Sequence, residues 1–347
     1  MGGLVVRLPL EMQVYRSGSK TAAGSELQRI LTSSSSSGED DNDYDDNFNK
    51  YIKKDNNSSS VSSGADLSVS ILAAKTVLWY RKARSFVRKS MEEIYASAEN
   101  ERIEVGSLEE DQIEFIKLML GGQQHWQEVS LVLERNERTG SGVTLALNRP
   151  LAFSVDDTVA RMVLYGTDPA EGVTITLTTD TIQAKRKEVD DFLSAFAEQC
   201  AVYIGGPDNM SEPAIIIHGI SDLEGSVEIA PGSGIYRGGI PAAVDGVLRG
   251  TYRPLDFRFF LGQNKHGDGP VTGKGEEEIE EVISGGLDAG VDSQAYQPVA
   301  CARSVALKQC MQLPKPLWHE VMELCGGELR EVSRLEMMKR DDLEEGE

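Results

Sequence analysis

The sequence predicts an α+β protein, with a mixed and mostly antiparallel sheet flanked by helices and a disordered N-terminal segment. Two observations predict the folded part. Short runs of β-branched and apolar residues end at Gly, Pro or Asn, and longer segments between them repeat their apolar residues at helical spacing. The third observation is the low complexity of residues 32–64, where serine and acidic runs bury too little apolar surface to offset the entropy of ordering them.

Charge and composition exclude several classes. The 347 residues include 56 acids and 35 bases, a formal net charge of −21, which repels phosphate backbones and argues against nucleic-acid binding. No run of about 18 apolar residues predicts a transmembrane helix, and no secretory signal opens the chain. The four cysteines lack CxxC spacing and indicate thiols, hence an intracellular, reducing compartment, either cytoplasm or plastid.

We expect six segments along the chain. They are a disordered N-terminal segment (1–64), a helical extension (65–125), the core domain (126–262), a Gly- and Glu-rich loop or insertion (263–300), C-terminal helices (301–340) and an acidic tail (341–347). No internal repeat is present.

The helical extension begins with a basic amphipathic helix over 66–100. Its apolar stripe is Leu72, Trp79, Ala83, Phe86 and Met91, and six basic residues lie between positions 75 and 89. We favour packing on the protein, with these charges solvated or facing its own acids, over contact with a membrane surface, an acidic partner or RNA. A second helix over 108–120 has a capping box of Ser107 and Glu110 and a stop at Gly121 and Gly122.

The core domain alternates strands and helices. We expect strands at 129–133, 143–147, 173–177, 201–204, 214–218, 225–229, 233–236 and 256–261. The helices between them cover residues up to 165, from a cap of Ser154 with Asp157, then 181–199, and a short helix opened by Pro241. Two more helices follow at 317–324 and 328–339.

Recognisable catalytic and cofactor motifs are missing. The sequence contains no P-loop and no GxSxG elbow, and Gly232 and Gly234 lack the third glycine of a dinucleotide site. The four histidines show no metal-ligand spacing, and His266 with Asp268 fits a solvated loop better than a metal site. We therefore assign no catalytic residue, no metal and no cofactor.

Three places carry residues suited to binding. Asn148-Arg149-Pro150 ends a strand, and the guanidinium of Arg149 could hold a carboxylate or phosphate, or form an internal salt bridge. Gly205-Gly206-Pro207 follows another strand, where glycines let a ligand or another backbone come close; we favour a tight turn packed under a neighbouring loop. His218 ends an apolar strand, where a hydrogen-bonded core histidine is the commoner reading than a catalyst.

These places, in this order, resemble the AlgH family. The segments that carry the resemblance are Leu145 to Pro150, Val202 to Pro207, Ile217-His218-Gly219, the Gly-rich hairpin from Gly225 to Gly239, and Phe257-Arg258-Phe259-Phe260-Leu261-Gly262. The resemblance implies a mixed sheet flanked by helices, no established activity, and Arg258 as a further candidate ligand-binding residue. Residues 263–267 depart from the bacterial pattern. The segments 316–318 and 325–327 resemble longer plant and algal members, which favours a plastid.

Three functions are open on the sequence. The leading hypothesis is a non-enzymatic binding or regulatory module whose partner is a protein or an anionic small molecule. The alternative is an enzyme acting on an anionic small molecule held by Arg149 and the Gly205–Gly206 backbone, with His218 as general base. Nucleic-acid regulation through the helix at 75–89 is disfavoured by charge, and peripheral membrane contact through the same residues is not favoured either.

Overall fold

A computed structural model describes residues 2–17, 64–96, 106, 108–124, 126–167, 179–267, 286–292, 295–311 and 316–344. The chain divides into two compact units. Unit 1 consists of Met1–Pro9 and Leu120–Val321, and unit 2 consists of Leu10–Met119 and Met322–Glu347. Both α5 and α12 therefore contain a boundary between units. The fold class is α+β, as the sequence predicts.

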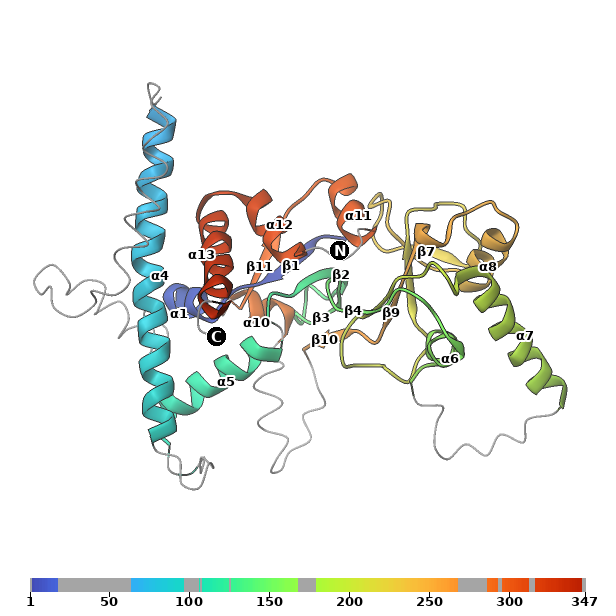
Figure 1. The fold of residues 1–347 in the computed structure, drawn as a ribbon, viewed down its shortest axis with the longest axis horizontal. Coiled ribbons are helices and arrows are strands. Elements are labelled where there is room, and N and C mark those ends of the chain that lie inside the picture. Colours follow the sequence, from blue (N-terminus) through green and yellow to red (C-terminus); the bar gives the residue numbers. More distant parts are fainter. Residues whose placement is uncertain are drawn as a thin grey trace, which may run out of the picture. The chain divides into compact units, whose positions relative to one another are not determined.

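The first sheet of unit 1 has five antiparallel strands in the order β10-β3-β2-β1-β11 (Figure 1). Its strands are β1 (Leu4–Arg7), β2 (Val129–Arg135), β3 (Gly142–Ala146), β10 (Asn264–His266) and β11 (Tyr296–Val299). The N-terminal strand β1 lies inside this sheet, since Leu4 pairs with Leu131 on one side and Val299 on the other. Strands β1 and β11, which come first and last in the chain, thus complete a sheet whose other three strands lie between them in the sequence.

The second sheet of unit 1 has six strands in the order β4-β5-β9-β6-β8-β7. Its strands are β4 (Pro150–Ala152), β5 (Val202–Ile204), β6 (Ile215–His218), β7 (Ser226–Glu228), β8 (Tyr236–Gly238) and β9 (Phe257–Leu261). Only the β5–β9 pair is parallel, so the sheet is mixed and mostly antiparallel.

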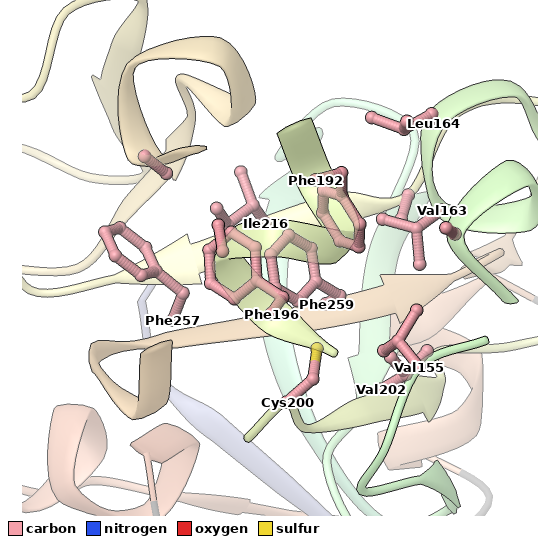
Figure 2. Close-up of a cluster of buried hydrophobic side chains, with 14 of the residues drawn as sticks. Val155, Val163, Leu164, Phe192, Phe196, Cys200, Val202, Ile216, Phe257 and Phe259 are labelled. Carbon is pink, nitrogen blue, oxygen red and sulfur yellow. The ribbon is translucent and has the colours of Figure 1, made fainter. Parts of the chain in front are cut away.

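Helices α6 (Asp157–Tyr165), α7 (Thr179–Phe196) and α8 (Ile240–Leu248) supply the core on one face of the six-stranded sheet (Figure 2). Alternation along β9 turns Phe257 and Phe259 to this face, where the Phe259 ring lies 5.4 Å from that of Phe192 and 5.1 Å from that of Phe196. Burial of these aromatic side chains stabilises the packing of α7 on the sheet.

Other short elements of unit 1 are η3 (Pro254–Asp256), α10 (Leu287–Asp292) and α11 (Arg303–Met311). Helix α10 packs on the five-stranded sheet, with Leu287 in an apolar cluster beside Val5 and Val132. Asp288 of the same helix forms a two-point ion pair with Arg135 at 2.9 and 3.0 Å.

Unit 2 is helical. It contains α1 (Leu10–Ser17), α4 (Gly64–Ala96), most of α5 (Glu110–Gln124) and α13 (Gly327–Glu344), while α12 (Leu317–Cys325) is shared with unit 1. The Tyr15 ring of α1 stacks on Trp79 of α4 at 4.1 Å, and the Tyr80 hydroxyl donates to the buried carboxylate of Glu336 in α13. Among the described residues, no helix is both long and apolar enough to cross a membrane.

Several boundaries differ from the sequence-based expectation. Residues 2–17 were expected in the disordered segment, but they form β1 and α1, while 18–63 lie outside the described residues. The sheets also extend past the expected core domain of 126–262, because β1, β10 and β11 all belong to unit 1. Consequently the expected loop at 263–300 contributes two strands and α10.

Two helix ends were also predicted wrongly. Gly121 and Gly122 lie within α5 instead of ending it, and Ser107 of the expected capping box lies outside the described residues. The N-cap of α6 is Asp156, whose carboxylate accepts the Val159 N–H at 2.8 Å, rather than Ser154. The expected strand at 173–177 is outside the described residues as well.

Candidate functional site

Asn148 marks the point where the chain passes from the first sheet of unit 1 to the second. Its side chain accepts the Val129 N–H at 3.1 Å and donates to the Gln127 carbonyl at 2.7 Å. One residue later, the Arg149 carbonyl accepts the Ile204 N–H at 2.8 Å, in the other sheet. The Asn148 amide therefore continues the β2–β3 ladder after the main chain has left it, as the expected strand-ending role requires.

Gly205, Gly206 and Gly262 bring two chain segments into backbone contact, and we call these three residues the glycine junction. The Gly205 N–H donates to the Leu261 carbonyl at 2.7 Å, and its own carbonyl accepts the Ala146 N–H at 2.9 Å. A Cβ atom on Gly206 would lie 2.2 Å from the Gln263 carbonyl carbon, and one on Gly262 would lie 2.2 Å from the Gly206 carbonyl oxygen. The close approach that these glycines allow is therefore made by the chain itself.

Beside the junction lies a buried carboxylate that sequence reasoning missed. Glu128 is 4% exposed, and its Oε1 accepts the Ser130 hydroxyl at 2.7 Å and the Asn264 amide at 3.1 Å. A Cβ on Gly206 would lie 2.4 Å from the Asn264 Oδ1, and Asn148 bonds the backbone on both sides of Glu128. Both motifs thus surround this carboxylate. The only sequence signal is an acid placed directly before an apolar strand.

Residues of β1 and β11 complete the polar face around Glu128. The Arg7 N–H donates to the Glu128 carbonyl at 2.9 Å, and the Arg7 guanidinium carbon lies 4.9 Å from the centre of the Tyr296 ring. Burial raises the pKa of Tyr296 to about 12, the negative charge of Glu128 adds to the rise, and Arg7 opposes it. Tyr296 is therefore neutral at ordinary pH.

His218 is fully buried at the far end of β6. Its Nδ1 accepts the Ile220 N–H at 3.2 Å and its Nε2 lies 3.2 Å from the Gly238 carbonyl, so the neutral Nε2–H tautomer satisfies both nitrogens. Burial lowers the pKa of His218, which favours that neutral form.

The β-register keeps His218 away from the glycine junction. His218 pairs with Phe257 at one end of β9, whereas Ile204 pairs with Leu261 at the other. Four residues along a strand span about 13 Å. The enzyme alternative requires His218 to lie beside Arg149 and Gly205. The structure does not bring these residues together.

The Arg258 side chain is buried and binds three backbone carbonyls. Its guanidinium donates to the carbonyls of Leu255 and Phe257, both at 2.8 Å, and to that of Met311 at 2.5 Å. Burial lowers the pKa of Arg258, though the side chain remains a cation in any ordinary buffer. These donors hold α11 to the sheet and are directed at backbone, not at a ligand.

Arg149 lies where apolar side chains are exposed. Its guanidinium donates to the Trp126 carbonyl, and it directly precedes the edge strand β4. The exposed fractions are 45% for Trp126, 44% for Leu151 and 43% for Phe153. We call Trp126, Arg149, Leu151 and Phe153 the β4 edge surface. Pro207, also predicted for the site, is exposed next to the glycine junction.

Within the described residues, no group of three or more His, Cys, Asp or Glu side chains is placed to hold a metal ion. His266 instead shares a hydrogen bond of 2.9 Å with the Thr144 hydroxyl, and Asp268 lies outside the described residues.

Comparison with known proteins identifies one domain within the chain. Residues 116–278 match the AlgH-like family. The chain carries an AlgH-like domain. No curated protein matches the sequence. Two solved structures are similar. The AlgH protein from Pseudomonas aeruginosa has 14% identity and a TM-score of 0.32, with 55% of this chain and 74% of that one covered. Protein DIP2367 from Corynebacterium diphtheriae has 14% identity and a TM-score of 0.34, with 59% and 80% covered.

The motifs that carry the resemblance to the AlgH family differ in what they do in this structure. Asn148, Gly205 and Gly206 hold two sheets together, and His218 and Arg258 are buried and hydrogen-bonded. Of the predicted site residues, the side chain of Arg149 alone combines a charge with an apolar exposed surrounding among the described residues.

Proposed function

We propose that the AlgH-like domain is a non-enzymatic binding module that captures a protein partner at the β4 edge surface. The supporting observation is the grouping of exposed Trp126, Leu151 and Phe153 beside Arg149. Tryptophan and arginine are enriched in binding hot spots, and exposed apolar side chains that cluster mark interaction sites, whereas an isolated exposed apolar residue is common on any protein.

The edge strand itself suggests how the partner is held. Arg149 and Phe153 direct their carbonyls into the sheet, to the N–H groups of Ile204 and Cys200. By strand alternation, Pro150 faces outward, and proline has no N–H to offer an added strand. Pairing of a further strand with β4 is therefore opposed. The partner is held by side chains, with an apolar centre against Leu151 and Phe153 and a carboxylate for Arg149.

Quantitative affinity capture from a lysate of the source cells tests this function. The immobilised baits are the full-length wild type and its Leu151→Asp, Arg149→Ala and Val227→Asp variants. Val227 is the matched control, since it is 64% exposed on β7, at the opposite edge of the same sheet. Proteins captured through the β4 edge surface should fall at least about tenfold on the Leu151 and Arg149 baits and stay unchanged on the Val227 bait.

Two outcomes oppose the proposal. If all four baits capture the same proteins in equal amount, the β4 edge surface is not the binding surface. If instead a small anionic metabolite raises the melting temperature of the wild type but not of Arg149→Ala, the partner is a small molecule and the protein-binding reading is wrong.

A further inference from the structure

The five-stranded sheet of unit 1 curls around one of its faces. Its edge strands are β10 and β11, and in a flat sheet four strand spacings would separate them by about 19 Å. The His266 ring on β10 nevertheless lies 5.6 Å from the Tyr296 ring on β11. We call the enclosed side the concave face. By register and alternation, its polar side chains include those of Arg7, Glu128, Ser130, Asn264, His266 and Tyr296.

Arg7 and Glu128 lie directly opposite each other on the concave face, and both are buried. The Arg7 N–H donates to the Glu128 carbonyl at 2.9 Å, so the two side chains leave the backbone about 5 Å apart. In the part of the chain that the structure describes, no ion pair joins Arg7 to a carboxylate, and its Nε has no hydrogen-bond partner. Exposed Arg135 of the same sheet does pair, with Asp288. Because a buried charge kept from its counter-charge is costly, this separation indicates a partner that the chain itself does not supply.

The two charged groups point away from each other. The Arg7 guanidinium carbon lies 4.9 Å from the centre of the Tyr296 ring, towards β11. The Glu128 carboxylate accepts the Asn264 amide at 3.1 Å, towards β10. Both charges still act on Tyr296, since burial and then Glu128 raise its pKa while Arg7 opposes the rise. A positive and a negative group thus border the same stretch of the concave face.

These charges restrict the class of ligand that could bind. A simple anion would be attracted by Arg7 and repelled by Glu128, and a simple cation would meet the reverse. A zwitterion can direct its carboxylate to Arg7 and its ammonium group to Glu128, so both charges gain a partner. The same face also carries an apolar cluster, in which Val5 and Val132 contact Leu287 of α10. This neighbourhood suits a small molecule with a zwitterionic end and an apolar remainder.

We propose that the concave face binds a free α-amino acid, with its carboxylate on the Arg7 guanidinium and its ammonium group at the Glu128 carboxylate. Half-buried His266 covers the face from the edge strand β10, so the ligand enters when this ring moves off Tyr296. The site involves no reaction, and it does not depend on the β4 edge surface.

Titration calorimetry of the wild-type full chain tests the chemistry of the ligand. The probes are the standard amino acids, one at a time, and then the analogues of the tightest binder that lack its amino group or its carboxyl group. The amino acid should bind at least about tenfold more tightly than either analogue, because each analogue loses a charged contact. If no amino acid binds, or if the analogue without an amino group binds equally well, the proposal is wrong.

Neutralising variants test whether the two buried charges hold the ligand. Arg7→Gln and Glu128→Gln should each weaken binding of the same amino acid by about tenfold or more. The matched controls are Lys265→Gln, on the opposite face of β10, and Glu134→Gln, at the exposed end of β2. They remove the same charges and should bind as the wild type does. Unchanged affinity in Arg7→Gln, or equal losses in the controls, would contradict a site on the concave face.

Hydrogen exchange of the wild type locates the ligand without any variant, so a failure of Arg7→Gln to fold leaves the proposal testable. The bound amino acid should slow amide exchange in β1 and β11 and leave β4 unchanged. Protection confined to β4 would place the ligand at the β4 edge surface instead and would rule out the concave face.

Discussion

The glycine junction and the β4 edge surface both lie where segments of unit 1 meet or pass between its two sheets, yet they differ in what contacts them. At the junction, the chain's own backbone fills the space that Gly206 and Gly262 leave open. At the edge, Leu151 and Phe153 face solvent. In the sequence the two motifs look equally suited to binding a ligand. Only their surroundings in the fold distinguish them. One determines stability, and the other is available for binding.

The largest expected effect is a loss of stability on substitution in the glycine junction. Gly262→Ala should lower the free energy of unfolding by about 3 kcal/mol or more. The residue has a φ of 66°, and a Cβ would also meet the Met210 sulfur at 2.5 Å. Urea unfolding of the full chain measures the loss. Gly234→Ala is the control, because its φ of 68° is similar but no atom lies within 4 Å of the added Cβ. It should cost about 1 kcal/mol, and equal losses would show that close packing is not the reason for Gly262.

A smaller loss of stability is expected at Asn148, where the chain passes from the first sheet to the second. Asn148→Ala removes two hydrogen bonds and leaves the Val129 N–H and Gln127 carbonyl without that partner, so it should cost about 1–3 kcal/mol. Asn136→Ala provides the comparison. Its side chain also makes two hydrogen bonds to the backbone, both accepted from N–H groups, but in an exposed turn where water replaces them. Equal stability losses in urea would contradict a special role for Asn148.

Away from the junction, the stability of the fold should also depend on pH through buried His218. Because burial lowers its pKa, the unfolded chain binds a proton near pH 6.5 that the folded protein does not take up. Stability from this group is present above pH 6.5 and is lost as pH falls, by at most about 1.4 kcal/mol per pH unit. Between pH 7.5 and 5.5, wild type should lose more stability than His218→Gln. Parallel pH profiles of the two proteins would show that His218 does not titrate on unfolding.

The smallest expected effect on stability is at the β4 edge surface. Leu151→Asp and Arg149→Ala change exposed or half-buried groups and should shift the free energy of unfolding by about 0.5 kcal/mol or less. Thermal melts checked against urea unfolding suffice. A loss of 2 kcal/mol or more for Arg149→Ala would mean that its bond to the Trp126 carbonyl is structural, and would erase the contrast with Asn148.

Much of the fold was accessible from sequence because its elements carry local signals. The apolar runs of β2, β6 and β9 and the turns that bound them predicted the sheets of the AlgH-like domain. By contrast, Leu4 to Arg7 make a strand too short for a periodic pattern, and their partners lie more than 120 residues away. Polar Asn264 to His266 become a strand only through pairing with β3. Gly121 and Gly122 continue a helix that their propensity alone would end.

The candidate site was less accessible, for a related physical reason. A sequence shows that Gly206 admits a close neighbour, but only the fold shows that the neighbour is Gln263. The sequence around Glu128 does not indicate that its carboxylate is buried. Its hydrogen bonds come from Ser130 and from Asn264, 136 residues later. The exposure of Leu151 and Phe153 likewise follows from the position of β4 at a sheet edge.

The inner position of β1 has a consequence for biosynthesis. Leu4 pairs with Val299, which lies 295 positions later in the chain. At a translation rate of about 5–20 residues per second, the first strand waits about 15–60 s for this neighbour to be made. Leu4, Val5 and Val6 are buried in the finished sheet, and during that interval they can pair only on the side of β2. A nascent chain therefore carries this apolar segment with one edge unpaired until β11 is made, and a chaperone that binds short apolar segments would favour its productive folding.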